Sequence, residues 1–321
     1  MIPKIIFDTD IGGDCDDAVA LAIALELMKT GECELLAVTS CTESEAPGGC
    51  IESILRYYGY GNLPIGCFRK DDGYFAPISH DVYATKTAMK YENRFRNGEH
   101  YENTVKLLRK IIAETSEPIT IVATGAFTSL AKLLESGPDE ASDLNGVELV
   151  RQKSTKAVCM GGRFTIEWPE PILVGDYVVE AEWNIRGDIP GAQITCEKWP
   201  GELILSSYEI GLPIITGQEL QVNGPENNPV RTCYEIWHEE NGGSPGRETW
   251  DGTTMLHAIR PNGGYWNLHE YGRIHVDDIG RTIWSPEEGG LHTFLTDKIP
   301  STDIENEINA ILNRDILRSK A

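Results

Sequence analysis

The chain has 321 residues, enough for a large α/β domain, and its 40 % hydrophobic and 8 % aromatic content is typical of a globular protein. Its 28 lysines and arginines are outnumbered by 50 aspartates and glutamates, so the formal net charge is −22. A protein this acidic should repel nucleic acid polymers and anionic membranes, which leaves small neutral substrates and cations as the favoured ligands. Because no repeat, low-complexity run or linker interrupts the chain, we expect residues 1–321 to form a single domain.

The eight cysteines are scattered without CxxC spacing, which favours reduced, partly buried thiols over a disulfide framework or a zinc site. Residues 1–7 lack the long apolar segment of a secretory signal, and no window approaches 18 apolar residues. We therefore expect a cytoplasmic protein. Cys15 lies among carboxylates that disfavour its thiolate, so we interpret it as a structural residue and not a nucleophile.

The first predicted elements are a strand, an acidic turn and a helix. Residues 5–7 are apolar and predict a buried strand, while residues 18–28 are rich in apolar helix formers and Gly31 follows as a stop signal. In an open α/β sheet such a turn lies at the carboxyl end of a strand, where ligands bind. Five aspartates lie in and around this turn: Asp8, Asp10, Asp14, Asp16 and Asp17.

Five carboxylates within ten residues would repel one another if all were ionised and unpaired, and a divalent cation is the simplest remedy. As a structural alternative, Asp16 and Asp17 complement the dipole of the following helix and Asp14 caps it, each contributing about 0.3–1 kcal/mol. That alternative suits any two of these residues but not five beside two glycines. The pattern therefore favours a metal site or a polar-substrate site.

Two metal-site templates can be tested by their spacing. An EF-hand loop starting at Asp8 needs a glutamate at its twelfth position, which holds Val19, so the EF-hand is excluded. A haloacid-dehalogenase-like phosphatase also begins with an apolar run and Asp-x-Asp, which Asp8 and Asp10 match, although Gly12 departs from that pattern. A magnesium-dependent phosphohydrolase with one of these aspartates as nucleophile is therefore kept as the second hypothesis.

The rest of the chain alternates strands and helices, which predicts a mostly parallel sheet with helical crossovers. The strands are expected at residues 34–40, 64–67, 118–124 and 156–162, with 203–206 and 213–216 near the sheet edge and a late hairpin around 272–277 and 283. The helices are expected at 49–58, 101–115, 125–131, 230–240, from about 251 onward, and 303–314. Residues 71–100 are interpreted as a lid or an ordinary insertion, and residues 241–248 as a flexible loop.

Three segments resemble one known family. Residues 8–21, DTDIGGDCDDAVAL, resemble the N-terminal signature of the inosine-uridine-preferring nucleoside hydrolases in its longer form, DTDxGxDxDDAxAL. Residues 122–131, VATGAFTSLA, are similar to the family's VxTGxxTNxA segment, and residues 156–162 end in a similar MGG. The better-studied signature is two residues shorter and has proline where this chain has Ile11. The resemblance runs from residue 5 to about residue 261.

This resemblance implies a Rossmann-like, open, mostly parallel sheet flanked by helices and a calcium-dependent hydrolase of the N-glycosidic bond of ribonucleosides or related N-ribosyl compounds. It implies a homodimer or homotetramer. Asp10 is implied as the base that activates the attacking water, with Asp8 as a supporting residue. The implied calcium ligands are Asp10, Asp17, the Thr124 carbonyl and Asp251, and the implied ribose-binding residues are Asp16, Asp176, Glu182 and Asn184.

The resemblance fails at the leaving group. Better-studied members have a histidine beside the last metal ligand, which acts as acid toward the departing base, and this chain has Trp250. Indole cannot act as a general acid at neutral pH, but it can stack on a base or pack in a core. The candidates for a replacement acid are His80, His238 and His257. A non-catalytic sugar- or calcium-binding relative is thus the third hypothesis. On the sequence alone, Asp251 also fits the N-cap of the helix that begins there. The role of Asp14 is open.

Overall fold

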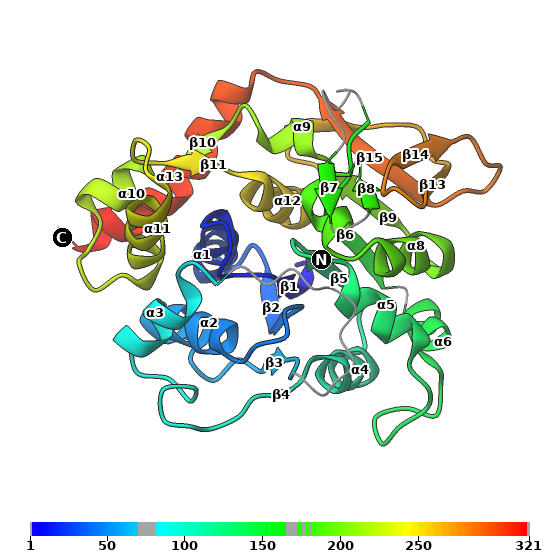
Figure 1. Ribbon diagram of the computed structural model, residues 1–321, viewed down its shortest axis with the longest axis horizontal. Helices are drawn as coiled ribbons and strands as arrows, with labels where there is room; N and C mark the ends of the chain where they lie inside the picture. Colours follow the sequence, from blue (N-terminus) through cyan, green and yellow to red (C-terminus); the bar gives the residue numbers. More distant parts are fainter. Residues whose placement is uncertain are drawn as a thin grey trace.

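The computed structural model describes residues 2–69, 81–153, 155–164, 172–174, 177–179 and 181–319. Within these residues a nine-stranded sheet runs through the centre of the molecule (Figure 1). Its strands are β1 (Lys4–Thr9), β2 (Glu34–Ser40), β3 (Ile65–Cys67), β4 (Glu102–Asn103), β5 (Ile119–Ala123), β6 (Lys156–Met160), β9 (Leu203–Ser206), β12 (Trp266–Leu268) and β15 (His292–Asp297).

The strand order is β12-β15-β9-β6-β5-β1-β2-β3-β4. All neighbours from β15 to β4 are parallel, and β12 is antiparallel to β15. The chain proceeds outward from β1 to β2 and β3 on one side, and from β5 to β6 and β9 on the other. The order therefore reverses between β1 and β5, which is where open α/β sheets form a ligand crevice. The predicted fold class is confirmed.

Helices cover both faces of the sheet (Figure 1). Alternate residues of β1 point to opposite faces, since Ile5 and Phe7 belong to one apolar core and Ile6 to the other. The first core includes residues of α1 (Asp16–Lys29), α2 (Ala46–Tyr57), α11 (Pro229–Asn241), α12 (Trp250–Ile259) and α13 (Ser301–Ser319). The second includes residues of α4 (Thr104–Glu114), α5 (Thr128–Glu135), α6 (Gly146–Gln152) and α8 (Ile189–Lys198).

Helix α1 is buried along nearly its whole length, which explains why its sequence is apolar on every side. It packs against α12, α13, α2 and α11 as well as β2. Its buried Glu26 forms ion pairs with Lys29 at 3.5 Å and with Arg318 of α13. No helix in the described part of the chain is long and apolar enough to cross a membrane.

Short helices and small sheets complete the fold. The helices are α3 (Ala84–Lys90), α7 (Trp183–Gly187), α9 (Tyr208–Gly211) and α10 (Gln218–Asn223). The paired strands are β7 (Ile172–Val174) with β8 (Tyr177–Val179), β10 (Ile215–Thr216) with β11 (Arg247–Glu248), and β13 (Arg273–Val276) with β14 (Thr282–Ser285). The late hairpin is confirmed as β13–β14.

The predicted position of residues 203–206 and 213–216 near the sheet edge is wrong. β9 is an interior strand because β15 adds beyond it in parallel, and β10 leaves the main sheet to pair with β11. Residues 241–248 thus end in a short strand and are not a loop throughout. Strand order depends on where the late strand β15 returns, which the local pattern around residues 203–216 does not encode.

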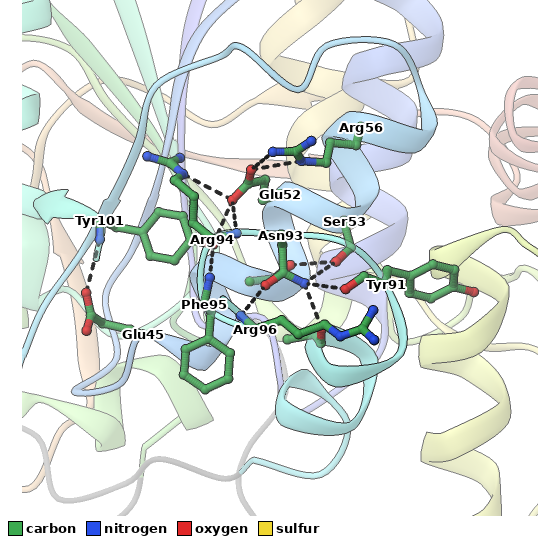
Figure 2. A network of polar contacts seen from close by, with 12 residues as sticks. Glu45, Glu52, Ser53, Arg56, Tyr91, Asn93, Arg94, Phe95, Arg96 and Tyr101 are labelled. Carbon is green, nitrogen blue, oxygen red and sulfur yellow. Dashed lines mark hydrogen bonds and ion pairs between the residues drawn. The ribbon is translucent and has the colours of Figure 1, made fainter. Parts of the chain in front are cut away.

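Residues 91–101 are tied to α2 by buried polar side chains (Figure 2). Glu52 accepts hydrogen bonds from the Arg56 side chain at 2.6 and 2.8 Å, from Arg94 at 2.9 and 3.1 Å, and from the Tyr101 hydroxyl at 2.8 Å. Asn93 donates to the Ser53 hydroxyl of α2 at 3.1 Å and to the Ala88 carbonyl of α3 at 2.6 Å. The described part of the predicted lid or insertion is therefore firmly attached to the domain, whereas residues 70–80 lie outside the described residues.

The acidic turn after β1 is held in place by residues 82–83, which directly precede α3. The backbone N–H groups of Val82 and Tyr83 donate to the Gly12 carbonyl at 2.8 and 3.3 Å, and the Tyr83 hydroxyl donates to the Asp14 carbonyl at 2.8 Å. Gly12 has a φ of 139°, a conformation that side-chain-bearing residues rarely adopt. These contacts fix the path of the turn that carries the candidate site residues.

Candidate active site

A cavity of about 520 Å³, lined by the turns that follow β1 and β5, lies at the carboxyl end of these strands. This volume is typical of a site for a small-molecule ligand. Eight of the nine predicted site residues line it: Asp10, Asp16, Asp17, Thr124, Glu182, Asn184, Trp250 and Asp251. The ninth, Asp176, lies outside the described residues. The sequence therefore identified residues that the fold brings to one place, although they span most of the chain.

Three buried carboxylates form the floor of the cavity. Asp16 and Asp17 begin α1, Asp251 lies in the first turn of α12, and one oxygen of each lies within 4.8 Å of the others. The Asp251 N–H donates to Asp16 Oδ2 at 3.1 Å. Asp17 Oδ1 accepts from the hydroxyls of Thr9 and, at 3.0 Å, Thr124. Asp10 lines the cavity nearby but is not one of these three.

Burial and mutual repulsion act together on these groups. Burial, followed by the charges of neighbouring aspartates, raises the pKa of Asp16, Asp17 and Asp251 well above the usual value. Burial likewise raises the pKa of Asp10 to about 7. A cluster of buried carboxylates with oxygen-only donors fits a hard divalent cation, which relieves the repulsion and keeps the groups ionised. The three carboxylates can therefore hold a metal ion.

Asp14 does not cap α1, and Asp251 does not cap α12. Asp16 and Asp17 do lie in the first turn of α1, where they complement its dipole as well as joining the cluster. The residue preceding α1 is Cys15 and the residue preceding α12 is Thr249, and neither helix has a side-chain cap. Asp251 lies inside the first turn of α12, so its carboxylate is directed to the cluster instead of the helix end. Asp14 forms an ion pair with Arg247, described below, and this contact answers the open question of its role in the fold.

A second wall of the cavity comes from the segment around α7. The Glu182 carboxylate accepts from the N–H groups of Asn184 at 2.8 Å, Gly162 at 3.1 Å and Ile185 at 3.3 Å, and so caps α7. Burial raises the pKa of Glu182 to about 7. The Asn184 amide donates to the Thr124 carbonyl at 3.1 Å, the same carbonyl that the resemblance assigns to calcium. Glu182 and Asn184 are thus held rigidly by backbone contacts.

A third wall is aromatic and cationic, and sequence reasoning found only Trp250 of it. The Trp250 indole donates to the Tyr208 carbonyl at 2.8 Å, and the two rings stack with centroids 5.6 Å apart. The Arg247 guanidinium lies 4.7 Å from the Trp237 ring centroid and 5.1 Å from that of Trp250. Arg247 falls in a glycine-rich stretch that is typical of a solvated loop, so no local signal distinguished it.

Of the three candidate acids, His238 and His257 do not line the cavity. The ring nitrogens of His238 contact the backbone carbonyls of Tyr234 at 2.9 Å and Ser244 at 2.8 Å. His257 is buried beside Trp266, and burial lowers its pKa to about 4. His80 lies outside the described residues. The lining residues in the described part of the chain include no histidine and no lysine.

Asp8 lies beneath the cavity and does not line it. It is fully buried, and Thr39 donates to one of its oxygens at 2.6 Å. Burial raises the pKa of Asp8 to about 7, while the hydroxyls of Thr39 and Ser129 lower it. A buried carboxylate in this place supports the turn above it and is not accessible as a nucleophile.

The family model for inosine-uridine preferring nucleoside hydrolases matches residues 5–310. The chain belongs to this family. The match extends past the last resembling motif into the first half of α13. As a member of this family the protein is an N-glycosyl hydrolase of the nucleoside hydrolase type, and the phosphohydrolase hypothesis is not supported.

Among curated relatives, the pyrimidine-specific ribonucleoside hydrolase RihA of Citrobacter koseri is 24 % identical over 292 residues, covering 81 % of this chain and 80 % of the relative. RihA of Salmonella newport is 28 % identical over 286 residues, covering 81 % of each chain. Among solved structures, an inosine-guanosine nucleoside hydrolase has a TM-score of 0.74 at 17 % identity, covering 98 % of this chain and 99 % of that one. A plant nucleoside hydrolase has a TM-score of 0.69 with the same identity and coverage. These structures share the fold.

Proposed function

We propose that the protein is a calcium-dependent hydrolase of the N-glycosidic bond of ribonucleosides or related N-ribosyl compounds, with Asp10 as the base. The observation that carries this proposal is the convergence of Asp10 with the trio of Asp16, Asp17 and Asp251 in one cavity at the point where the strand order reverses. Because the RihA relatives are named for pyrimidine ribonucleosides, uridine and cytidine are the first substrates to test.

The carboxylate trio and Asp10 suit the two tasks of this reaction. Asp10, Asp17, Asp251 and the Thr124 carbonyl would hold the calcium ion, which would supply a Lewis acid for the attacking water and an anchor for the ribose hydroxyls. Asp10 lines the cavity beside the trio and accepts a proton from the attacking water. The surrounding carboxylates stabilise the positive charge that develops on the sugar as the C1′–N bond breaks.

The ribose hydroxyls are assigned to Asp16, Asp176, Glu182 and Asn184. Glu182 and Asn184 are fixed by backbone hydrogen bonds, so they meet the requirement that a binding residue be oriented before the substrate arrives. Both Asn184 amide hydrogens are used, toward the carbonyls of Thr124 and Met160, and its side-chain oxygen accepts no bond from the described residues. That oxygen is suited to accept a hydrogen bond from a sugar hydroxyl.

The proposal is tested by measuring free ribose released from uridine, cytidine, inosine and adenosine, with calcium and with a chelator. We expect ribose from at least one nucleoside, lost on chelation and restored by calcium but not by magnesium. Phosphate release from phosphomonoesters with magnesium would instead indicate the phosphohydrolase. Binding of ribose by calorimetry without turnover of any nucleoside would indicate the non-catalytic relative, and either result would overturn the proposal.

A further inference from the structure

Arg247 is the cationic side chain of the described cavity lining. Its Nε lies 3.0 Å from both carboxylate oxygens of Asp14, and its Nη2 lies 2.6 Å from Asp14 Oδ2. Its Nη1 donates to the Glu248 carboxylate. The rings of Trp237 and Trp250 flank its guanidinium. These contacts on several sides hold the group in one orientation.

The Arg247 guanidinium is anchored by these contacts but still has N–H groups that donate to none of the described residues. Of its five N–H groups, Nε–H and one on Nη2 face Asp14, and one on Nη1 faces Glu248. One N–H on each terminal nitrogen therefore remains uncommitted among the described residues. Since Arg247 also lines the cavity and its side chain is 24 % exposed, those two donors are available to a ligand.

The position of Arg247 separates it from the sugar-binding wall. It lies on β11, four residues before Asp251, and α11 and β11 flank α12 on the side away from β6 and β9 (Figure 1). The Asn184 amide, in contrast, contacts the Met160 carbonyl at the end of β6. The carboxylate trio belongs to α1 and α12, which lie between these two sides. Because both walls line the same cavity, a nucleoside whose sugar contacts Glu182 and Asn184 can place its C1′ substituent beside Arg247.

We propose that Arg247 binds the leaving group and stabilises the negative charge that develops on it, an inference that rests on the proposed function. The electron pair of the C1′–N bond passes to the leaving nitrogen and spreads to a conjugated carbonyl oxygen of the base, which the two free N–H groups of Arg247 bind. The water oxygen forms the new bond to C1′, and the water proton passes through Asp10 to the released base. The products are free ribose and the neutral base, so atoms and charge balance.

This assignment defines a class of leaving group. Arginine does not give up its proton at neutral pH, so it favours a base that departs as an anion over one that departs after protonation. Bases with an oxygen conjugated to the glycosidic nitrogen, as in uracil, meet this requirement because the oxygen carries the charge. Adenine has no such oxygen and offers Arg247 only ring nitrogens, over which the negative charge of the departing base is less well stabilised. We therefore expect uridine to be hydrolysed much faster than adenosine.

The competing explanation is that Arg247 only anchors the acidic turn through Asp14. Such a positioning role lowers the rate for every substrate by the same factor. A leaving-group role lowers it most where the leaving group is a poor anion. Uridine and p-nitrophenyl riboside share the ribose and differ in their leaving groups, and p-nitrophenolate is the more stable anion of the two, so this pair separates the explanations.

The experiment compares kcat/KM of Arg247→Met and the unaltered protein on both substrates in saturating calcium. We expect a loss of about 10²-fold or more for uridine and of less than about 10-fold for p-nitrophenyl riboside. Arg247→Lys, which keeps the charge, should recover part of the uridine rate and serves if the methionine variant folds poorly. Calorimetry with uracil should show at least a tenfold weaker affinity for Arg247→Met, a readout independent of turnover.

Arg231→Met is the matched control. Arg231 is similarly exposed at 20 %, forms an ion pair with Glu235 at 2.7 Å, and does not line the cavity. It should leave the ratio of the two rates unchanged. Equal losses on both substrates in Arg247→Met, or unaltered uracil affinity, would overturn the inference while leaving the proposed function intact. An unaltered protein that hydrolyses neither substrate nor any nucleoside would overturn both.

Discussion

The backbone N–H of Asp251 donates to the Asp16 carboxylate across 3.1 Å, which joins the first turns of α12 and α1. The two residues are 235 positions apart in the chain, so the contact exists only when both ends of the domain have folded together. The same pairing brings the carboxylates of Asp16, Asp17 and Asp251 within reach of one ion. The metal-binding capacity of the site is therefore coupled to the packing of α1 against α12.

Replacing Asp251 with asparagine should stabilise the metal-free protein. The substitution removes one of three mutually repelling buried carboxylates, and an asparagine amide can donate to the carboxylate of Asp17. We expect the free energy of unfolding in chelator to rise by about 1–3 kcal/mol at pH 7.5, the equivalent of one or two pKa units. In saturating calcium the unaltered protein should be the more stable of the two. It gains about 2.7 kcal/mol when calcium is present at a hundred times its Kd, and the variant gains less.

Urea unfolding of both proteins, with chelator and with calcium, measures these differences. Asp143→Asn removes an exposed aspartate far from the cluster in sequence and is the control, with no expected change in either condition. If Asp251→Asn destabilised the metal-free protein and left the calcium gain unchanged, Asp251 would be a structural residue and not part of a cation site.

Calcium should stabilise the protein more as the pH rises. Burial raises the pKa values of Asp10 and Glu182 to about 7, and burial with mutual repulsion raises those of the trio well above their usual value. A carboxyl group with a raised folded-state pKa binds more protons in the folded than in the unfolded chain. Its stabilising contribution is complete below its unfolded pKa of about 4 and is lost as the pH rises through 7.

The melting temperature in chelator should therefore fall between pH 5 and pH 8, while calcium, which takes the place of the protons, should oppose this fall. Melting curves at pH 5, 6, 7 and 8 with and without calcium provide the measurement. A calcium-induced shift that stays constant across this range would contradict the idea that the cation binds these carboxylates.

The sequence was sufficient to predict the parts of the site that follow local rules. A short apolar run, an acidic glycine turn and an apolar helix define β1 and α1, and the Thr124–Gly125 turn repeats the arrangement after β5. Parallel strands bring their carboxyl ends to one edge, so the meeting of Asp10 with Thr124 follows from the alternation of strands and helices. The motif around Glu182 and the aspartate after Trp250 were placed by resemblance, and the cavity contains both.

The aromatic and cationic wall could not be predicted in the same way. The ion pair of Asp14 with Arg247 joins residues 233 positions apart, and no spacing rule connects them. Arg247 follows a run of glycines and serine that is typical of a solvated loop, and its order comes from the pairing of β10 with β11. Trp237 is one of several aromatic residues of an amphipathic helix, and no local pattern distinguishes it as a site residue. Long-range contacts of single side chains, unlike helix and strand periodicity, leave no local pattern.

Asp10→Asn should abolish turnover and preserve the fold. Asparagine keeps the size and one oxygen of aspartate but cannot accept the proton of the attacking water, so kcat should fall by about 10²–10⁴-fold. Stabilisation by calcium should be reduced but not lost, because Asp17, Asp251 and the Thr124 carbonyl remain and the asparagine keeps one side-chain oxygen. Steady-state ribose release and calcium-dependent melting of the variant test both statements. A variant with undiminished kcat would refute Asp10 as the base.

Gly211→Ala tests whether the position of Trp250 matters for activity. A Cβ at residue 211 would lie 2.4 Å from the Trp250 Cα and 2.6 Å from its Cδ1, and backbone atoms cannot move aside as a flexible side chain would. We expect a loss of about 1–3 kcal/mol in the free energy of unfolding. We also expect reduced kcat/KM for nucleosides, since Trp250 directly precedes Asp251.

Gly137→Ala is the control because no atom lies within 4 Å of its Cβ position, so its stability should match or slightly exceed that of the unaltered protein. Equal free energies of unfolding for the two variants would mean that α9 and α12 move apart at little cost, and would contradict the expected loss of stability. Full activity in a destabilised Gly211→Ala would show that the Trp250 wall tolerates displacement.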